Sequence, residues 1–323
     1  MTTILVLALD GMMDSCLAIT LDTIRAAQSI QSRGGKGRSV RLLVAGHRKT
    51  VRGSGGMRLD VDMTFAEVMA GAVRPEWIVI PGLGLTSEED IAARFAQKDA
   101  LAAIELVKQA PHGTQLGAAC SAVFLLAQAG LLAGRHATMT WWLAAVFRTR
   151  FPDVRLDETR MLVRDGPCLT AGSAYAQLDL TLALVADTMG TSVAHLCSRY
   201  LLIDQRPSQA RYMVQSHTQH IDPTVVAAER WIDANLSNPI SITQLAAALA
   251  VSPKTLSRRI DAAMGVSPVK FIQRRRLLHA SHLIETTNKS IEAIAAEVGY
   301  QDATALRKLV KREFGMTPAA LRG

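Results

Sequence analysis

One pattern occurs twice in the C-terminal third of this chain of 323 residues. Residues 241–268 read SITQLAAALAVSPKTLSRRIDAAMGVSP, and residues 290–318 read SIEAIAAEVGYQDATALRKLVKREFGMTP. Equivalent apolar positions lie 49 residues apart before the middle of the pattern and 50 residues apart after it, as Leu256 and Leu306 do. Because the match holds on both sides of a single added residue, we interpret the two segments as an internal duplication.

Each copy has the signature of a helix, a tight turn and a second, basic helix. Ser241 and Ser290 are good N-caps for the first helices, whose alanines would let a second helix pack closely. Ser252 and Pro253 mark the start of the second helix in the first copy, and Asp302 marks it in the other. Two helix-turn-helix motifs are therefore predicted, and this motif places its second helix in the major groove of DNA.

The second helices carry the residues expected to contact DNA. Early residues of such a helix face base edges, whereas charges farther along usually contact phosphates. Arg258 and Arg307 are the strongest candidates for reading sequence, because a guanidinium can bind both major-groove acceptors of guanine. The predicted base-contacting residues are Lys254, Thr255, Arg258, Ala303, Thr304, Arg307 and Lys308. The predicted phosphate contacts are Arg259, Lys311 and Arg312. The alternative is that these residues are only the solvated faces of two surface helices.

The length and the charge distribution favour two domains. The formal net charge is +8, and residues 221–323 hold 14 Lys or Arg and 9 Asp or Glu, against 22 and 19 in residues 1–220. A basic excess around the duplicated helices is typical of a nucleic-acid-binding domain. A polar segment containing Pro207 precedes this region. The predicted division is a domain over 1–205, a linker over 206–221 and a DNA-binding domain over 222–323.

The composition disfavours several other classes of protein. The four cysteines have neither CxxC spacing nor histidines at zinc-like intervals, so we expect no metal site, no disulfide framework and a cytoplasmic location. The N-terminus lacks the pattern of a secretory signal. Residues 109–134 carry no charge but include Pro111 and Gly113, which favours a buried strand and helix over a membrane span. No cofactor is predicted.

The N-terminal two thirds alternate apolar runs with helical patterns. The predicted strands are residues 4–9, 40–45, 77–81 and 115–119, and the predicted helices are residues 15–31, 88–109, 121–129 and 173–189. Such alternation predicts an α/β fold, with a mostly parallel sheet covered by helices on both faces. The C-terminal domain, with its two helix-turn-helix motifs, is predicted to be all-α.

A candidate ligand site lies beyond the carboxyl ends of the predicted strands, where open parallel sheets bind ligands. Cys120 follows the strand at residues 115–119 directly and enters a helix without a loop, as the nucleophile of an elbow does. A helix N-terminus at this place would stabilise a thiolate. The predicted ligand-contacting residues are Asp14, Gly82, Cys120, Ser121 and Thr140.

Residues 4–189 resemble the class I glutamine amidotransferase-like superfamily, in its ThiJ/PfpI branch of intracellular peptidases and glyoxalases. The resemblance is carried by WIVIPG (77–82), ACSAVFLLAQAGLLAGRHATMTWW (119–142) and TAGSAYAQLDLTLALVAD (170–187), and it implies a flavodoxin-like fold. Enzymes of this superfamily commonly have His directly after the elbow cysteine, where this chain has Ser121. The regulator branch frequently has His where this chain has Thr140. Because both bases are missing, Cys120 is expected to line a pocket, and no catalytic residue is predicted.

Residues 225–322 resemble the AraC/XylS family of transcription regulators. The most specific stretches are SPKTLSRRIDAAMGVSP and the segment from RRRLLHASHL to TPAALR. In that family a single helix links two reading heads, and residues 268–285 match it. Asp261 departs from the family pattern because a basic residue is common there, and Leu306 and Val310 replace frequent aromatic residues.

The two halves together resemble the GlxA-type regulators, in which a ThiJ/PfpI-like domain senses a metabolite and an AraC-type domain binds promoters. This resemblance implies a non-enzymatic, homodimeric activator that responds to a small, nitrogenous metabolite and works on promoter DNA with RNA polymerase. Two alternatives remain open. One is a cysteine-dependent enzyme of the amidase, peptidase or glyoxalase type tethered to a DNA-binding domain. The other is a nucleoid-type DNA binder that has no effector.

Overall fold

The computed structural model describes residues 1–33, 39–204, 206–213 and 222–322. They form two compact units, one of Met1–Leu143 with Asp153–Arg206 and the other of Ala144–Pro152 with Pro207–Gly323. The domain division at 1–205, 206–221 and 222–323 stays a prediction, and residues 205 and 214–221 of it lie outside the described residues. No described helix is both long and apolar enough to cross a membrane.

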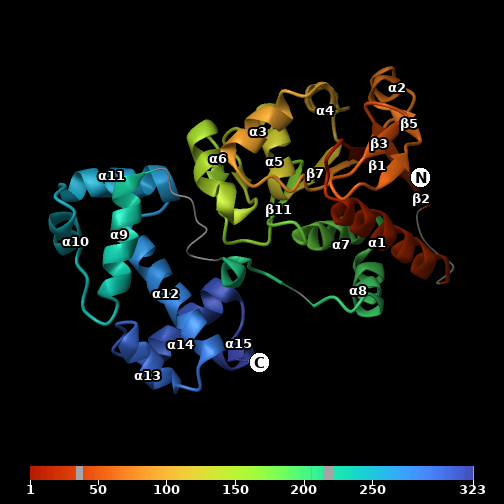
Figure 1. Cartoon of the computed structure of the whole chain (residues 1–323). Helices are drawn as coiled ribbons and strands as arrows, with labels where there is room; N and C mark the ends of the chain where they lie inside the picture. Colours follow the sequence, from red (N-terminus) through yellow and green to blue (C-terminus); the bar gives the residue numbers. More distant parts are fainter. Residues whose placement is uncertain (34–38, 205, 214–221, 323) are drawn as a thin grey trace. The chain divides into compact units, whose positions relative to one another are not determined.

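The first unit is an α/β fold built on a seven-stranded sheet (Figure 1). The strand order is β10-β11-β7-β6-β1-β2-β5, and every pair is parallel except β10 with β11. The strands of this sheet are β1 (Thr2–Ala8), β2 (Val40–Gly46), β5 (Met63–Thr64), β6 (Trp77–Ile80), β7 (Gln115–Ala119), β10 (Leu162–Asp165) and β11 (Cys168–Ala171). Two short pairs stand apart, β3 (Thr50–Arg52) with β4 (Arg58–Asp60) and β8 (His136–Ala137) with β9 (Arg155–Leu156).

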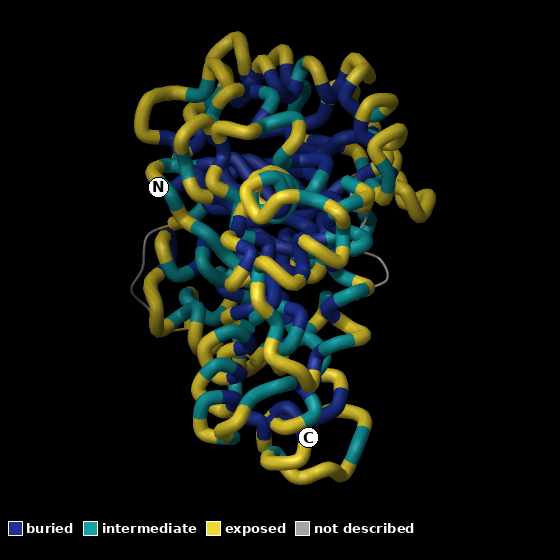
Figure 2. The backbone as a smooth tube through the Cα atoms, turned by 90° about the vertical axis from the view of Figure 1, so that its left-hand side faces the viewer, coloured by how far each residue is buried: buried dark blue, intermediate teal, exposed yellow. Residues whose placement is uncertain are grey.

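Helices cover both faces of this sheet, which confirms the predicted fold class. The helices of the unit are α1 (Asp14–Arg33), α2 (Phe65–Met69), α3 (Glu88–Phe95), α4 (Lys98–Lys108), α5 (Val123–Gln128), α7 (Ala176–Met189) and α8 (Thr191–Tyr200), with short 3-10 turns η1 (Cys120–Ala122) and η2 (Trp141–Leu143). Helices α1, α7 and α8 pack together on one face, and α3, α4 and α5 lie on the other (Figure 1). Every side chain of β1 is consequently buried, and Figure 2 shows the same for the centre of the sheet.

The prediction of a single helix over residues 88–109 is wrong, because the structure has two helices there, α3 and α4. Gln97 between them has an extended backbone, with φ −72° and ψ 147°. Asp99 in the first turn of α4 is buried, accepts a hydrogen bond from the amide of Asp10 at 3.0 Å and pairs with Arg94 at 2.6 Å. These two partners hold the first turn of α4 in a buried position. Strands β5, β10 and β11, helix α8 and the two short strand pairs were not predicted from the sequence.

The second unit is all-α, as predicted. Its helices are α6 (Ala144–Arg150), α9 (Pro223–Ala234), α10 (Ile242–Ala248), α11 (Pro253–Met264), α12 (Pro268–Thr286), α13 (Ile291–Glu297), α14 (Ala303–Phe314) and α15 (Pro318–Arg322), with the 3-10 turn η3 (Ala210–Tyr212). Helices α10 and α11 form one helix-turn-helix motif, and α13 and α14 form the other. The predicted N-caps are confirmed, since the side chains of Ser241, Ser252, Ser290 and Asp302 each accept a hydrogen bond from an amide of the helix that follows.

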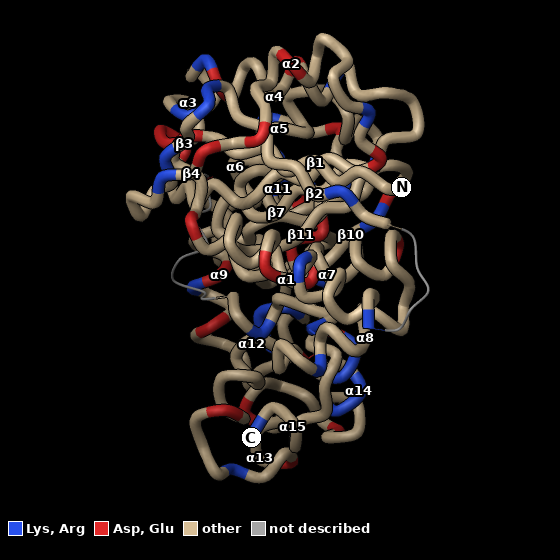
Figure 3. Tube along the Cα trace, turned by 90° about the vertical axis from the view of Figure 1, so that its right-hand side faces the viewer, with Lys and Arg blue, Asp and Glu red and all other residues tan. Residues whose placement is uncertain are grey.

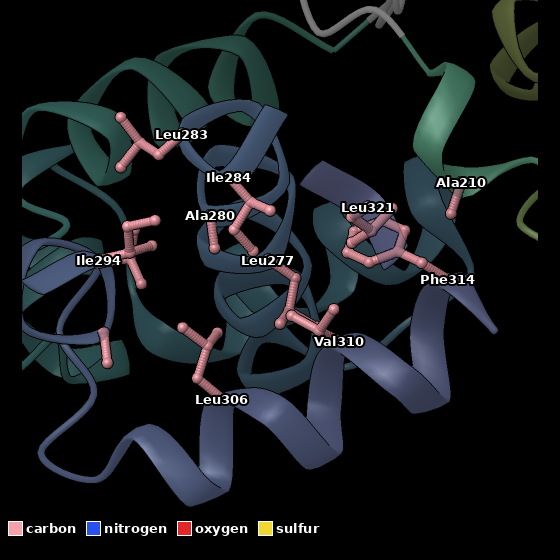
Figure 4. Close-up of a cluster of buried hydrophobic side chains, with 12 residues drawn as sticks. Ala210, Leu277, Ala280, Leu283, Ile284, Ile294, Leu306, Val310, Phe314 and Leu321 are labelled. Carbon is pink, nitrogen blue, oxygen red and sulfur yellow. The ribbon is translucent and has the colours of Figure 1, made fainter. Parts of the chain in front are cut away.

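Each helix-turn-helix motif packs on its own small core, and α12 contributes to both. Phe271 and Ile272 of α12 lie in the first core, with Leu245, Leu256 and Ile260. The second core contains buried residues of α12, α13, α14 and α15 (Figure 4). Its α12 members are Leu277, Ala280, Leu283 and Ile284. Ala210, which belongs to the predicted linker, is also buried in this second core (Figure 4).

The two motifs turn through the same backbone conformation with different residues. Ala250 has φ +53° at the turn of the first motif, and Gly299 has φ +78° at the equivalent turn of the second. A left-handed conformation costs an alanine about 1 kcal/mol, whereas glycine adopts it readily. Gly299 is needed for space as well, because a Cβ there would lie 2.3 Å from the carbonyl oxygen of Leu236 and 2.7 Å from Nη2 of Arg276.

We therefore expect opposite effects from exchanging the two residues. Ala250→Gly should raise the free energy of unfolding of the second unit by ~0.5–1 kcal/mol, because it relieves the left-handed alanine. Gly299→Ala should lower it by ~2 kcal/mol or more, because the new methyl group meets the backbone at Leu236 and the half-buried side chain of Arg276. Urea titration of the full chain, followed by far-UV circular dichroism, measures both. Equal effects of the two substitutions would contradict this account of the turns.

Candidate nucleic-acid interface and elbow cysteine

The structure fixes the register of the two recognition helices, α11 and α14. Each has 12 residues and ends at a glycine in the left-handed conformation, Gly265 or Gly315. Equivalent positions are therefore 50 residues apart throughout both helices. Arg258 consequently corresponds to Lys308, and Arg307 corresponds to Ser257. The two arginines that the sequence analysis grouped as sequence readers thus stand at different places on their helices.

The apolar stripe of each recognition helix faces its core, and this leaves the basic residues outside. Leu256 and Ile260 are fully buried in α11, as Leu306 and Val310 are in α14. The predicted contacts that are exposed are Lys254, Arg258, Thr304, Arg307, Lys308, Lys311 and Arg312, whereas Thr255, Arg259 and Ala303 are half-buried. Figure 3 marks in blue the Lys and Arg positions of α14. The surface that carries most of the predicted DNA contacts is therefore accessible in both motifs.

A groove of about 670 Å³ runs beside the outer face of α11. It is lined by Lys254, Thr255, Ser257, Arg258, Asp261, Ser267 and Pro268. Two cationic side chains thus share the groove with one carboxylate, that of Asp261. In the second motif the position of Asp261 is taken by Lys311, so the two recognition helices differ in charge at the same place.

Two of the predicted phosphate contacts have partners within the protein. Nη1 of Arg259 donates to the hydroxyl of Thr224 and lies 3.5 Å from the carboxylate of Asp222, so its guanidinium is held at the start of α9. Nη2 of Arg312 donates to Oε1 of Gln273 in α12 at 3.1 Å. Neither partner could be recognised from spacing along the sequence. Their roles as phosphate contacts stay predictions.

Three consecutive arginines of α12 connect the two motifs. Nε of Arg274 lies 3.6 Å from Oε1 of Glu313. Nη1 of Arg275 pairs with Oε1 of Glu229 at 3.0 Å, and its Nη2 pairs with the carboxylate of Asp233. Arg276 donates from Nη1 to the carbonyl oxygen of Gly299 at 3.0 Å and from Nη2 to that of Asn238 at 2.7 Å. Arg275 therefore binds α9, which packs in the core of the first motif, and Arg274 binds α14 of the second motif. Arg276 joins the turn of the second motif to the loop that follows α9. The side chains at position 275 and at Glu229 are nearly buried, with exposed fractions of 7% and 12%.

In the first unit, the backbone at Cys120 has the geometry of a nucleophile elbow. Cys120 follows β7 and has φ +56°, a conformation that non-glycine residues rarely adopt. Its amide donates to the carbonyl oxygen of Gly172 at 2.7 Å, and the residue is fully buried. The sequence prediction of a sharp strand-to-helix turn at this cysteine matches the strand, 3-10 turn and helix observed here.

The electrostatics at Cys120 do not produce a thiolate. Burial raises the pKa of the Cys120 thiol, although hydrogen bonds with Ser121, the backbone of Gly84 and the hydroxyl of Thr140 act in the opposite direction. Burial, and then the neighbouring Cys120, raise the pKa of Cys16 to about 12. Both thiols are therefore protonated at neutral pH. The sequence analysis expected the helix N-terminus to favour the thiolate, and desolvation outweighs that effect here.

The structure places four of the predicted ligand contacts, Gly82, Cys120, Ser121 and Thr140, close together, with Cys16 beside them. Their role in binding a ligand stays a prediction. A Cβ at Gly82 would lie 3.1 Å from Cβ of Cys120 and 3.1 Å from Sγ of Cys16, so the glycine permits this close approach. Cys16 lies 104 positions before Cys120, and no local pattern pointed to it.

The backbone at Leu85 forms a strap over the cluster of Cys16, Gly82, Cys120, Ser121 and Thr140. The amide of Leu85 donates to Oγ of Ser121 at 3.1 Å, and its carbonyl oxygen accepts from Nε1 of Trp142 at 3.2 Å. Ser121 and Thr140 are fully buried beneath it.

The described contacts of Asp14 are with the loop between β3 and β4, not with Cys120. Its Oδ2 accepts from the amide of Met57 at 3.2 Å, and a Cβ at Gly53 would lie 1.5 Å from its Oδ1. Asp14 therefore fixes the loop between β3 and β4. Its role as a ligand contact stays a prediction without support from these contacts.

Each of the two units matches a known protein family or domain. The DJ-1/PfpI family matches residues 2–187, and a helix-turn-helix domain matches residues 245–323. The HTH-type transcriptional regulator GlxA of Rhizobium meliloti is 29% identical over 218 residues, which is 65% of this chain and 65% of that protein. The HTH-type transcriptional regulator GbdR of Pseudomonas aeruginosa is 27% identical over 220 residues, 66% of this chain and 59% of that protein. The chain thus spans less than two thirds of the length of these relatives.

A solved structure supports the fold of the first unit. DJ-1beta of Drosophila melanogaster superposes with a TM-score of 0.50 and 19% identity, covering 63% of this chain and 99% of its own. At that identity the likeness concerns the fold alone.

Removal of the buried cation at position 275 tests the link between the motifs. Arg275→Met should lower the free energy of unfolding of the second unit by ~3 kcal/mol, because it removes the nearly buried guanidinium that pairs with the carboxylates of Glu229 and Asp233. The matched control is Lys289→Met, which breaks the exposed pair with Glu297 and should cost less than ~1 kcal/mol. Urea titration measures both, and equal costs would show that the link is not stabilising.

The state of the thiols predicts slow alkylation of the native protein. All four cysteines are free and buried, and burial raises the pKa of Cys168 to about 11 as well. At mildly alkaline pH, iodoacetamide should therefore label the folded chain at least ~10-fold more slowly than the urea-unfolded chain. Mass spectrometry of tryptic peptides gives the rate at each cysteine. Rapid, stoichiometric labelling of Cys120 in the folded chain would contradict the protonated, buried thiol.

Proposed function

Because the chain belongs to the DJ-1/PfpI family through residues 2–187 and is an AraC-family helix-turn-helix protein in its C-terminal part, we propose that it is a sequence-specific, DNA-binding regulator of transcription. The observation that carries the proposal is the pair of basic recognition helices, α11 and α14, joined by the single helix α12. Two heads that follow one groove lie about one helical turn of DNA apart, so each chain covers about two turns of duplex.

Both heads read bases from the first half of their recognition helix. In the first head, Arg258 lies in the groove beside α11 with Lys254 and Thr255, and it binds the major-groove edge of guanine. In the second head, Arg307 and Lys308 have this role, with Ala303 and Thr304 toward the start of the helix. Lys311 and Arg312 contact phosphates on the same side, and Arg259 does so from the first head.

The first unit binds a small metabolite, nitrogenous by resemblance to the family, next to Gly82, Cys120, Ser121 and Thr140. The hydroxyls of Ser121 and Thr140 supply polar contacts, and the strap at Leu85 opens to admit the ligand. A ligand biases regulation only if it binds one conformation better than another, which typically amounts to about 1–3 kcal/mol. Asp14 is a weaker member of this site, because the β3–β4 loop holds its carboxylate.

The wider assembly is a cytoplasmic homodimer that activates promoters together with RNA polymerase. This part of the proposal rests on the resemblance to the family and on the related proteins, which carry the name of transcriptional regulators. The free, buried cysteines agree with a reducing compartment.

The alternative function is a cysteine-dependent enzyme of the amidase, peptidase or glyoxalase type tethered to a DNA-binding domain. Nucleophilic catalysis needs a base that takes the proton of the thiol. The groups that interact with Cys120 are hydroxyls, backbone amides and a second thiol, and burial raises the pKa of the cysteine. The regulator is therefore favoured. Turnover of a small carbonyl or amide substrate that is abolished by thiol alkylation would instead support the enzyme.

Gel-shift titration of the full chain on a duplex selected from a random library tests whether Arg258 and Arg307 contact DNA while Cys120 belongs to a separate ligand site. Arg258→Ala and Arg307→Ala should each weaken binding by about 5-fold to 100-fold, because each removes a bidentate contact to a base. Cys120→Ala should leave the affinity within about 2-fold, because it changes the ligand site and no base contact. Equal losses for all three variants would defeat the proposal.

A further inference from the structure

The second recognition helix carries an ion pair that the first lacks. Nη2 of Arg307 donates to Oε1 of Glu292 at 2.5 Å, so α14 is tied to the first turn of α13. The equivalent residues of the first head are Ser257 and Thr243, which carry no charge. Among the described residues, the second head thus pairs a candidate base-reading arginine with a carboxylate of its own first helix, and neither equivalent position of the first head is charged.

This ion pair contributes little to folding. The side chains of Arg307 and Glu292 are 47% and 64% exposed, and exposed pairs typically stabilise proteins by less than about 1 kcal/mol. Its own backbone amide, then Arg307, keep the pKa of Glu292 below its usual range, so the carboxylate is charged at neutral pH. The pair lies on the exposed side of the second head, which also carries Thr304, Lys308 and Lys311, so both of its side chains are accessible to DNA.

The chemistry of the pair bears on how an arginine selects its target. A free arginine side chain loses about 2 kcal/mol of rotamer entropy when it is fixed, and its charge is drawn to any nearby phosphate. A carboxylate that holds Nη2 removes part of that entropy cost beforehand and offsets the charge. The guanidinium has five N–H donors, so the donors that Glu292 does not use remain for the two acceptors of guanine.

We propose that Glu292 is a positioning residue that holds Arg307 for guanine and weakens its attraction to phosphates, so that the second head discriminates between bases through this pair. The inference rests on the proposed function, in that Arg307 must contact a base. It makes the heads unequal, because Arg258 in the first head shares its groove with Asp261 and has no partner equivalent to Glu292.

The test uses the full chain and two probes, a duplex selected on the wild-type protein from a random library and an unselected random duplex of equal length. Glu292→Gln keeps the shape of the side chain and removes its charge. It should lower the ratio of selected to random affinity by about tenfold, by weakening the first and strengthening the second. Repeating the selection with Glu292→Gln should give a reduced preference for guanine at one position of the site.

Three further variants make the outcome decisive. Glu297→Gln is the matched control, because Glu297, at the other end of α13, forms a similar exposed pair with Lys289 at 2.6 Å, and it should leave the affinity ratio within about 2-fold. Adding Glu292→Gln to Arg307→Ala should change nothing more, since the two residues act through one contact. Arg307→Lys keeps the charge but loses the planar fork, and it should also lose the guanine preference.

Each result bears on a different claim. If Arg307→Ala leaves base preference unchanged, the assignment of base reading to Arg307 fails and the inference fails with it. If Arg307→Ala removes the preference but Glu292→Gln does not alter the affinity ratio, only the inference fails. An effect of Glu292→Gln that persists in the Arg307→Ala background would likewise overturn it. Thermal unfolding curves that match the wild type confirm that the variants are folded.

Discussion

The DNA-binding unit depends on one element, the helix α12 with its three consecutive arginines. Each helix-turn-helix motif packs on a core of only about a dozen buried residues, and cores of that size are marginal alone. Helix α12 places Phe271 in one core and Leu277 in the other, and Arg274, Arg275 and Arg276 bind elements on both sides of it. Neither motif can therefore loosen without disturbing contacts of the other. The same contacts fix the separation of the two recognition helices, which decides the bases that both can reach together.

The first unit shows how an enzyme-like turn can exist without enzyme-like electrostatics. Cys120 keeps the left-handed backbone of a nucleophile elbow, which costs an L-residue energy and is usually retained only when the surroundings impose it. Those surroundings are the bond from its amide to Gly172, the close contact with Gly82 and the strap at Leu85. Together they bury the thiol, and burial raises its pKa. The geometry that would expose a nucleophile in an enzyme therefore holds a neutral side chain here, which suits a ligand-lining residue better than a reactive one.

The sequence predicted most of what depends on local or periodic signals. The parallel sheet and the caps at Ser241 and Ser290 follow from patterns of a few residues, and the two helix-turn-helix motifs follow from the repeat at 49 to 50 positions; all are confirmed. The errors and omissions involve partners distant in sequence. Asp99 divides a predicted helix because Asp10 and Arg94 bind it, Cys16 joins the elbow from another element, and Arg259 turns toward Asp222. Short edge strands such as β5 were missed because two residues carry no periodicity.

The register of the recognition helices changes how the duplication is understood. Arg258 and Arg307 are the two arginines predicted to read bases, but they are not equivalent positions, because the helix ends at Gly265 and Gly315 pair Arg258 with Lys308. A lysine is a point charge with no planar fork, so under the proposed function this position binds guanine differently in the two heads. Arg307 lies one position earlier, about 100° around the helix, and therefore approaches the groove from another side. Glu292 occupies that side. Under the proposed function, the two heads share a fold but present an arginine to DNA from different directions, so we expect an operator that is not a simple repeat even though the binding domain is one.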